Sequence, residues 1–316
     1  MMVAVASFTF LLAAFCAALM GFAIQRGATC TVAAVGEIVH NGTATKTMAL
    51  AETSLWVAGG LLTAQVLGFL PEIPGGFAFS HWTVIGATLL GLGAFVNQAC
   101  VFGAIARLGT GQWAYALTPL GFYIGIITTP LLFKGEMPVI TDTLPAGSTL
   151  PYWLAPAFGL YALWRIFRII RSRQAEGGNW TQLWAPHEAT ILIGITFVIM
   201  LISVGAWSYM DLLLHISRGM FDSLIWQGAL FASLLAGAIA GGWAGGHLAW
   251  HRQSSRTIAR CIAGGMLMGW GSLLVPGSND GLILVGMPLL WPYAWASIMI
   301  MCFVIWVAFK LQQKFD

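Results

Sequence analysis

Apolar stretches long enough to cross a lipid bilayer recur from one end of the chain to the other. Charged residues are scarce: they make up 8% of the chain, whereas an ordinary soluble domain carries about a quarter. This pattern predicts an all-α polytopic membrane protein, embedded in the lipid bilayer and without a separate soluble domain. The formal net charge of +3 gives no reason to expect nucleic acid as a partner.

The apolar pattern predicts about nine long transmembrane helices and four short re-entrant helices. The long helices are expected at about 3–24, 47–70, 82–96, 112–133, 150–170, 188–208, 223–250, 256–276 and 290–311. The short helices are expected near 30–39, 100–108, 210–218 and 279–287. Each short helix follows a long one, after a break in the helical pattern that contains glycine or polar residues.

A ten-residue pattern recurs at these breaks. Gly21–Cys30 reads GFAIQRGATC, Gly91–Cys100 reads GLGAFVNQAC, and Gly269–Ser278 reads GWGSLLVPGS. In each copy a glycine stands nine positions before a cysteine or serine, with polar residues or a proline between them. The corresponding segment of the fourth break, SVGAWSYMD, matches only weakly. Backbone that leaves the helix at membrane depth is tolerated where protein or a water-filled cavity surrounds it, so the repeats predict a path lined by broken helices.

The basic residues predict the orientation of the chain. A run of arginines between 165 and 173 places the following loop in the cytoplasm, and two lysines place the C-terminus there too. The N-terminus is then outside. We expect residues 1–149 to form a first half, 150–187 a connecting span with a cytoplasmic basic loop, and 188–316 a second, inverted half. Such an inverted-topology repeat with a pseudo-two-fold axis is typical of secondary transporters.

Three residues at the ends of the repeated pattern are the main site candidates: Cys30, Cys100 and Ser278. Each is expected at the N-terminus of a short helix, where free N–H groups and the helix dipole favour an anion. A thiol is a weak donor, and a conducting site must bind weakly enough to release its substrate. The alternative is that the two cysteines are small residues that allow close helix packing.

Further polar residues near the breaks complete the predicted substrate path. They are Gln25, Arg26, Asn97, Gln98, Asn279 and Asp280. Arg26 either reaches toward water or pairs with Asp280 across the centre, and Asp280 alternatively caps its own short helix. The amides either bind substrate oxygens or satisfy the broken backbone. Glu52 lies near a span end, where an interfacial position explains it.

The segments QRGATC at 25–30, NQACVFG at 97–103 and GGMLMGWGSLLVPGSNDG at 264–281 resemble motifs of the YeeE/YedE sulfur-transport family of bacterial inner-membrane proteins. The resemblance implies thiosulfate uptake along a narrow path at the centre of an hourglass-shaped fold. It also implies that Cys30 and Cys100 are the first and second path cysteines, which pass the ion along by S–H···S hydrogen bonds. The chain departs from the family where a GCN-type motif reads GSN, with Ser278 in place of a cysteine.

The lead hypothesis is therefore an importer of thiosulfate or a related small sulfur anion in the bacterial inner membrane. The alternatives are a membrane sulfurtransferase that hands a persulfide to a cytoplasmic sulfur-carrier protein, a transporter of a selenium species, and a structural membrane subunit. No histidine stands near either motif cysteine to activate it, which favours a transporter over an enzyme. The five cysteines show no CxxC pair, so neither a metal site nor a cofactor is expected.

Overall fold

The structure, a computed structural model, describes residues 2–70, 73–133, 138, 140–141, 151–175, 184–220, 224–250 and 252–315. Within these ranges every regular element is helical except one antiparallel pair of two-residue strands, β1 (Gly76–Phe77) and β2 (Ile140–Thr141). The long helices are α1 (Met2–Gly27), α3 (Thr45–Val66), α4 (His81–Asn97), α6 (Leu117–Leu132), α7 (Leu154–Ala175), α8 (Pro186–Val204), α10 (Leu224–Ala244), α11 (Ser255–Leu274) and α13 (Pro292–Phe315). A 3-10 turn, η1 (Trp113–Ala116), leads directly into α6.

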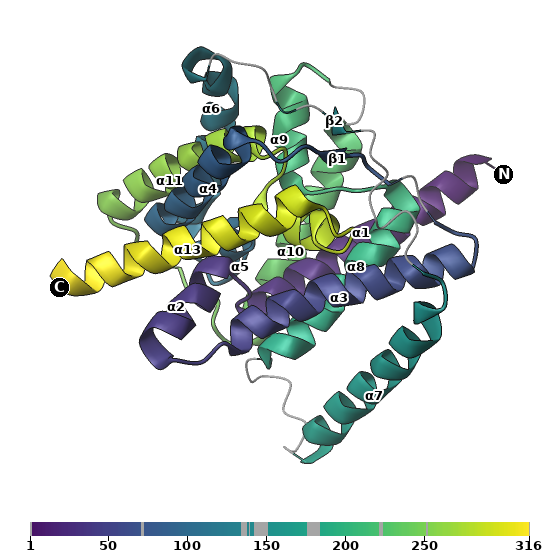
Figure 1. The fold of residues 1–316 in the computed structure, drawn as a ribbon. Coiled ribbons are helices and arrows are strands. Elements are labelled where there is room, and N and C mark those ends of the chain that lie inside the picture. The colour runs from purple at the N-terminus through teal and green to yellow at the C-terminus, as the bar shows by residue number, and fades with distance from the viewer. Residues whose placement is uncertain are drawn as a thin grey trace.

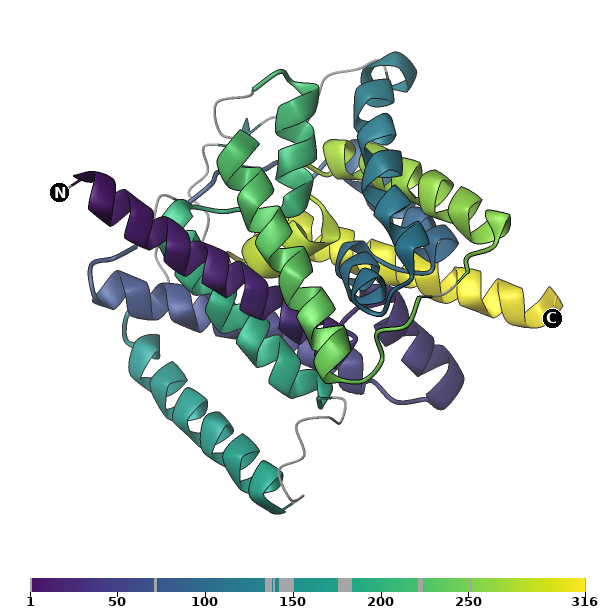
Figure 2. The same cartoon turned by 180° about the vertical axis from the view of Figure 1, so that it is seen from behind.

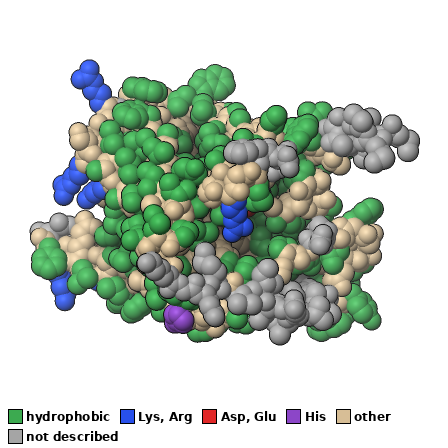
Figure 3. Space-filling view, turned by 90° about the horizontal axis from the view of Figure 1, so that it is seen from above, with side chains coloured by type: hydrophobic (Ala, Val, Ile, Leu, Met, Phe, Trp, Pro, Cys, Tyr) green, Lys and Arg blue, Asp and Glu red, His purple; other side chains and the backbone are tan. Residues whose placement is uncertain are grey.

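Seven stretches of the described residues are long and apolar enough to cross a membrane, so the chain is a multi-pass membrane protein. They are 8–41, 81–109, 113–132, 186–204, 224–244, 255–274 and 292–315. Figure 3 shows one face of the molecule, on which hydrophobic side chains predominate. The prediction of an all-helical polytopic membrane protein is confirmed at this level. Helices α3 and α7 have 22 residues each but are not among the seven, so the predicted number of nine spans stays a prediction.

Four short helices each follow a long helix after three or four residues. They are α2 (Thr31–Asn41), α5 (Val101–Gly109), α9 (Tyr209–Ser217) and α12 (Asn279–Gly281), the last continued by the π-helical η3 (Leu282–Gly286). Each break contains a residue with positive φ: Ala28, Gln98, Gly205 and Gly277. Left-handed backbone cannot continue a right-handed helix, so these residues end α1, α4, α8 and the turn after α11.

Helices from the two parts of the chain lie side by side. Helix α1 lies against α8 and α10, and α4 lies against α11 and α13; α11 also contacts α6, and α8 contacts α3 (Figures 1 and 2). The two chain ends lie at opposite sides of the molecule. Helix α7 stands at the edge of the bundle, where it packs mainly on α3. The first residues of the four short helices, Thr31, Val101, Tyr209 and Asn279, are buried, whereas α2 ends in exposed residues.

Glycines bring α1 and α10 into backbone contact. A Cβ atom on Gly237 would overlap the Ala18 carbonyl oxygen, and one on Gly21 would overlap the Leu234 carbonyl oxygen. Small residues of this kind are the usual means by which membrane helices approach closely, because lipid supplies no hydrophobic drive for their association. Close contact between α1 and α10 holds the break after α1 at a fixed position in the bundle.

Candidate substrate path

Four polar or sulfur-bearing side chains stand at the N-caps of the short helices. Cys30 precedes α2, Cys100 precedes α5, Ser208 precedes α9 and Ser278 precedes α12. All four have extended backbone, the usual N-cap conformation, so the first N–H groups of each helix are free to bond outside it.

The two cysteines exchange backbone hydrogen bonds. The Cys100 N–H donates to the Cys30 sulfur over 3.3 Å, and the Thr31 N–H donates to the Cys100 sulfur over 3.3 Å. Cys30 is 6% exposed and Cys100 is fully buried. A Cβ atom on Gly103 would lie 2.6 Å from the Cys30 sulfur, so only glycine at 103 permits this approach. The starts of α2 and α5 therefore face each other across a pair of thiols.

The start of α5 also meets α9 and α12. The Val101 N–H donates to the Asn279 Oδ1 over 3.3 Å, and the Tyr209 hydroxyl donates to the Val101 carbonyl oxygen over 3.0 Å. Asn279 and Tyr209 are both buried. These bonds bring the N-terminal ends of four short helices into one buried region, which we call the junction: Cys30, Cys100, Val101, Ser208, Tyr209, Ser278 and Asn279.

The polar residues before Cys100 serve the broken backbone. The Asn97 amide donates to the Ala99 carbonyl oxygen over 2.8 Å and accepts from the Thr118 hydroxyl over 3.1 Å. The Gln98 carbonyl oxygen accepts from Arg107 over 3.3 Å, while its side chain is exposed. These amides were expected either to bind substrate oxygens or to satisfy the broken backbone. The Asn97 side chain has the second of these roles, and the exposed Gln98 side chain lies outside the junction.

Gln25 and Arg26 lie in the last turn of α1 and are buried against the C-terminal part of α10. A Cβ atom on Gly241 would lie 2.9 Å from the Gln25 Oε1, and one on Gly245 would overlap the Arg26 guanidinium. The suggested pairing of Arg26 with Asp280 is wrong, because Asp280 instead accepts a hydrogen bond from the Ser278 hydroxyl and forms no ion pair within the described ranges. Arg26 thus packs against the end of α10 and does not pair with Asp280.

Two cavities approach the junction beside Ser278. A cavity of about 350 Å³ lies between α6, α9 and the break before α12, with Arg218, Asp211 and Ser278 among its lining residues. A smaller one of about 70 Å³ lies between Ser208, Ser278 and Asp280, enough for one or two water-sized groups. Cys30 and Cys100 line neither of these cavities. The two cavities therefore reach Ser278 and not the pair of thiols.

The family model described as sulphur transport matches residues 26–307 of the chain. The chain belongs to this sulphur-transport family. The match agrees with the resemblance drawn from the three motifs and includes every candidate path residue except Gln25. No curated protein matches the chain. Membership in a sulphur-transport family together with a multi-pass helical membrane fold supports transport of a sulfur compound.

Spacing from glycine does not find the fourth N-cap, Ser208, but another sequence signal does. Ser208 and Asp211 form a capping box: the Ser208 hydroxyl accepts from the Met210 N–H, and the Asp211 carboxylate accepts from the Ser208 N–H. The sequence S-x-x-D is the recognised pattern for that arrangement. Among the residues that the structure describes, no cluster of three or more His, Cys, Asp or Glu side chains could hold a metal ion.

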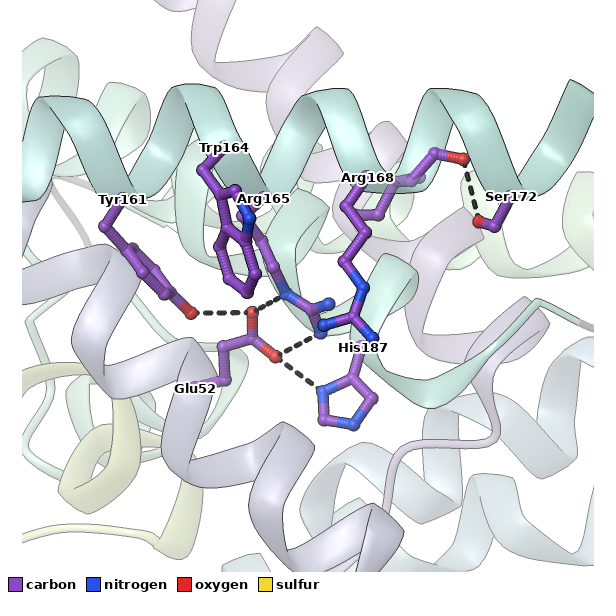
Figure 4. Close-up of a pocket in the computed structure, with 8 residues that line it drawn as sticks. Glu52, Tyr161, Trp164, Arg165, Arg168, Ser172 and His187 are labelled. Carbon is purple, nitrogen blue, oxygen red and sulfur yellow. Dashed lines mark hydrogen bonds and ion pairs between the residues drawn. The ribbon is translucent and has the colours of Figure 1, made fainter.

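A second polar cluster surrounds Glu52, which has specific partners in addition to the interfacial position expected of it (Figure 4). Glu52 is 9% exposed and accepts from Arg165 over 2.6 and 2.9 Å, and from the Tyr161 hydroxyl over 3.0 Å. Its Oε2 also contacts the His187 Nδ1 at 2.5 Å. No local pattern predicts these bonds, because Arg165 is 113 positions further along the chain.

Proposed function

We propose that this member of the sulphur-transport family imports thiosulfate, or a related small sulfur-containing anion, across the bacterial inner membrane. The substrate crosses at the junction, where Cys30, Cys100 and Ser278 are successive donors. The observation that carries the proposal is the reciprocal pair of hydrogen bonds between the cysteine sulfurs and the starts of α2 and α5. Without substrate, each cysteine sulfur accepts a hydrogen bond from a backbone N–H group. An entering anion would accept these hydrogen bonds in place of the sulfurs.

The junction suits an anion without a fixed cation. The starts of α2, α5 and α9 are the positive ends of helix dipoles, which stabilise negative charge. The first N–H groups of α2 and α5 bond outside their own helices, to the Cys100 sulfur and the Asn279 Oδ1. A thiol is a weak donor and a polarisable partner for a sulfur anion. Weak donors favour release as well as binding, which a transport path requires. Ser278 donates more strongly than a thiol but cannot form a persulfide, which favours hydrogen bonding over covalent sulfur transfer at that step.

We also propose that the chain forms two inverted halves, 1–149 and 188–316, joined by the connecting span and basic loop at 150–187. In two inverted halves each helix has an equivalent in the other half: α1 corresponds to α8, α3 to α10, α4 to α11 and α6 to α13. A contact in one place should then recur between the equivalent helices. The contact between α1 and α10 recurs between α8 and α3, and the contact between α4 and α13 recurs between α11 and α6. The result would be nine spans and four re-entrant helices, with the N-terminus outside and the C-terminus in the cytoplasm.

The first test is growth of a bacterial host that lacks other sulfate and thiosulfate importers, with thiosulfate as the sole sulfur source. The host carries the parent, Cys100→Ala, or the control Cys302→Ala, in which the same change is made in α13, away from the junction. At matched membrane expression, we expect growth with the parent and the control and none with Cys100→Ala.

Growth with all three proteins would make Cys100 a packing residue and contradict the donor path. Growth with none of them would exclude thiosulfate and favour another sulfur or selenium species. A persulfide on Cys100 after exposure to thiosulfate, seen by mass spectrometry, would favour the sulfurtransferase and a cytoplasmic carrier instead.

A further inference from the structure

Helix α7 leaves two cavities between itself and the rest of the bundle. One, of about 450 Å³, is lined mainly by polar and charged residues, including Glu52 of α3 and His187 of α8, and we call it the polar cavity. The other, of about 330 Å³, is almost wholly apolar and lies along the later parts of the same two helices. The opposite face of α7 exposes large apolar side chains to the surroundings: Leu160, Leu163, Phe167 and Ile170. An amphipathic molecule in the bilayer would find a polar and an apolar compartment side by side here.

The polar cavity contains two guanidinium groups and one carboxylate. Tyr161, Trp164, Arg165, Arg168 and Ser172 follow one another at helical spacing along the inner face of α7. Figure 4 shows Arg165 directed at Glu52, which forms the ion pair described above, and the Arg168 guanidinium directed into the same cavity. Glu52 balances the charge of Arg165, so the Arg168 guanidinium is the group in this cavity that an added anion would neutralise.

Arg168 is held in place by an aromatic ring. Its guanidinium carbon lies 5.5 Å from the centre of the Trp164 ring, and no carboxylate pairs with it in the part of the chain that the structure describes. A guanidinium is the usual protein ligand for phosphate, because it presents several N–H donors in a planar fork. Arg168 therefore supplies a positioned positive charge for a phosphate group.

The apolar cavity has the length of one leaflet of hydrocarbon. Its lining along α3 runs from Trp56 to Leu67, which at 1.5 Å per residue is about 17 Å, while half a bilayer core is about 15 Å. Trp56 lies one turn beyond Glu52, and its ring meets the Phe158 ring edge-on at 5.5 Å. Both of these aromatic residues line the apolar cavity, whereas Glu52 lines the polar one. The polar and apolar compartments thus adjoin along the direction of α3.

We propose that an anionic glycerophospholipid binds between α7 and the bundle, with its phosphate at Arg168 and an acyl chain in the groove between α3 and α8. The basic end of α7 is predicted to face the cytoplasm, where the leaflet is rich in anionic lipid. The lipid would fill the space that separates α7 from α8 and fix α7 to the bundle. This site is independent of the transported substrate.

The test is lipid binding to the purified full chain in detergent. Binding is measured by the shift of the protein's thermal midpoint and by native mass spectrometry. The probes are phosphatidylglycerol, phosphatidylcholine with the same acyl chains, and inorganic phosphate. We expect phosphatidylglycerol to raise the midpoint most and inorganic phosphate to have little effect. Arg168→Gln should weaken phosphatidylglycerol binding about fivefold, the usual effect of one basic residue at an anionic lipid surface.

Two further variants separate the headgroup from the acyl chain. Arg171→Gln removes the same charge from an exposed position on α7 outside the cavity and should bind as the parent does. Ile202→Trp, at an exposed position that lines the apolar groove, should fill it and weaken phosphatidylglycerol binding without changing the effect of phosphate. If Arg168→Gln does not purify as a folded protein, Arg168→Lys, which keeps the charge, should retain the preference for phosphatidylglycerol over phosphatidylcholine.

Four results would overturn the proposal. Equal binding of phosphatidylglycerol by Arg168→Gln and Arg171→Gln would show that Arg168 holds no headgroup. A midpoint shift by inorganic phosphate as large as that by phosphatidylglycerol would make the cavity a site for a free anion. Unchanged lipid binding by Ile202→Trp, or no preference between the two lipids, would exclude an anionic lipid whose chain lies in the groove.

Discussion

Ser278 differs from the other two path residues in chemistry but shares their position. It is the N-cap of α12, as Cys30 and Cys100 are the N-caps of α2 and α5. Its hydroxyl donates to the buried Asp280 carboxylate, and it lines both cavities that approach the junction. At this position the side chain both satisfies a buried charge and reaches the space through which an anion would enter.

Ser278→Ala should therefore lower both stability and uptake. The change leaves the Asp280 carboxylate without its hydroxyl donor, at a cost of about 1.5–3 kcal/mol for a hydrogen bond to a charged group. Ser278→Cys, which restores a donor, should retain uptake. Uptake of radiolabelled thiosulfate and the thermal midpoint are the measurements. Ser297→Ala is the control, since that buried serine donates only to the Tyr293 carbonyl oxygen in its own helix. Equal uptake by Ser278→Ala and the control would remove Ser278 from the path.

Individual path residues were predictable only where spacing fixes a helix start. The distance from glycine gave Cys30, Cys100 and Ser278 as residues at the starts of short helices, and these are N-caps in the structure. Spacing does not say where a side chain points. Arg26 packs on α10 instead of meeting Asp280, and the Gln98 side chain is exposed, because three-dimensional neighbours decide both.

At the scale of secondary-structure elements, the main feature is the contact between the starts of the short helices. Their starts meet through bonds that cross between elements, from α2 to α5, from α9 to α5 and from α5 to α12. Helix bounds were largely predictable from hydropathy and helix-ending residues. The predicted span 223–250 is too long, because α10 ends at Ala244, where Gly245 and the positive φ of Gly246 stop the helix. The start of α9 is encoded by its capping box, S-x-x-D at 208–211, and not by the repeated pattern.

The α9 cap gives a test at this scale. Ser208→Ala removes the acceptor for the Met210 N–H and should cost about 1 kcal/mol of stability, the usual value for a lost N-cap. Ser254→Ala removes an equivalent cap from α11, at the end of that helix far from the junction. Both variants should lower the thermal midpoint by a similar amount, and only Ser208→Ala should also reduce thiosulfate uptake, because α9 carries the Tyr209 contact to Val101. Similar uptake by the two variants would show that the start of α9 has no part in transport.

The whole molecule consists of interleaved helices from the two parts of the chain, with α7 at the edge. The order of the spans predicted two inverted halves, but neither which helices of one part would pack on the other nor the attachment of α7. Several arginines at one end of a helix indicate which side of the membrane that end faces. Nothing in the sequence of α7 indicates that one of these arginines has a buried carboxylate partner. That partner, Glu52, is brought near only by the path of the chain from α3 through six further elements to α7.

The ion pair between Glu52 and Arg165 should therefore control how firmly α7 is attached. Arg165→Gln leaves the Glu52 carboxylate with only Tyr161 and His187 among the described residues and should lower stability by about 2 kcal/mol, since hydrogen bonds to a charged group are lost. The double variant Glu52→Gln with Arg165→Gln removes the unbalanced charge and should regain part of that loss. Thermal midpoints and protease cleavage within the loop after α7 measure the attachment, with Arg171→Gln as the exposed control. If Arg165→Gln matched that control, or if the double variant were the sum of its two single variants, α7 would be held by its apolar contacts with α3 and by whatever fills the cavities beside it.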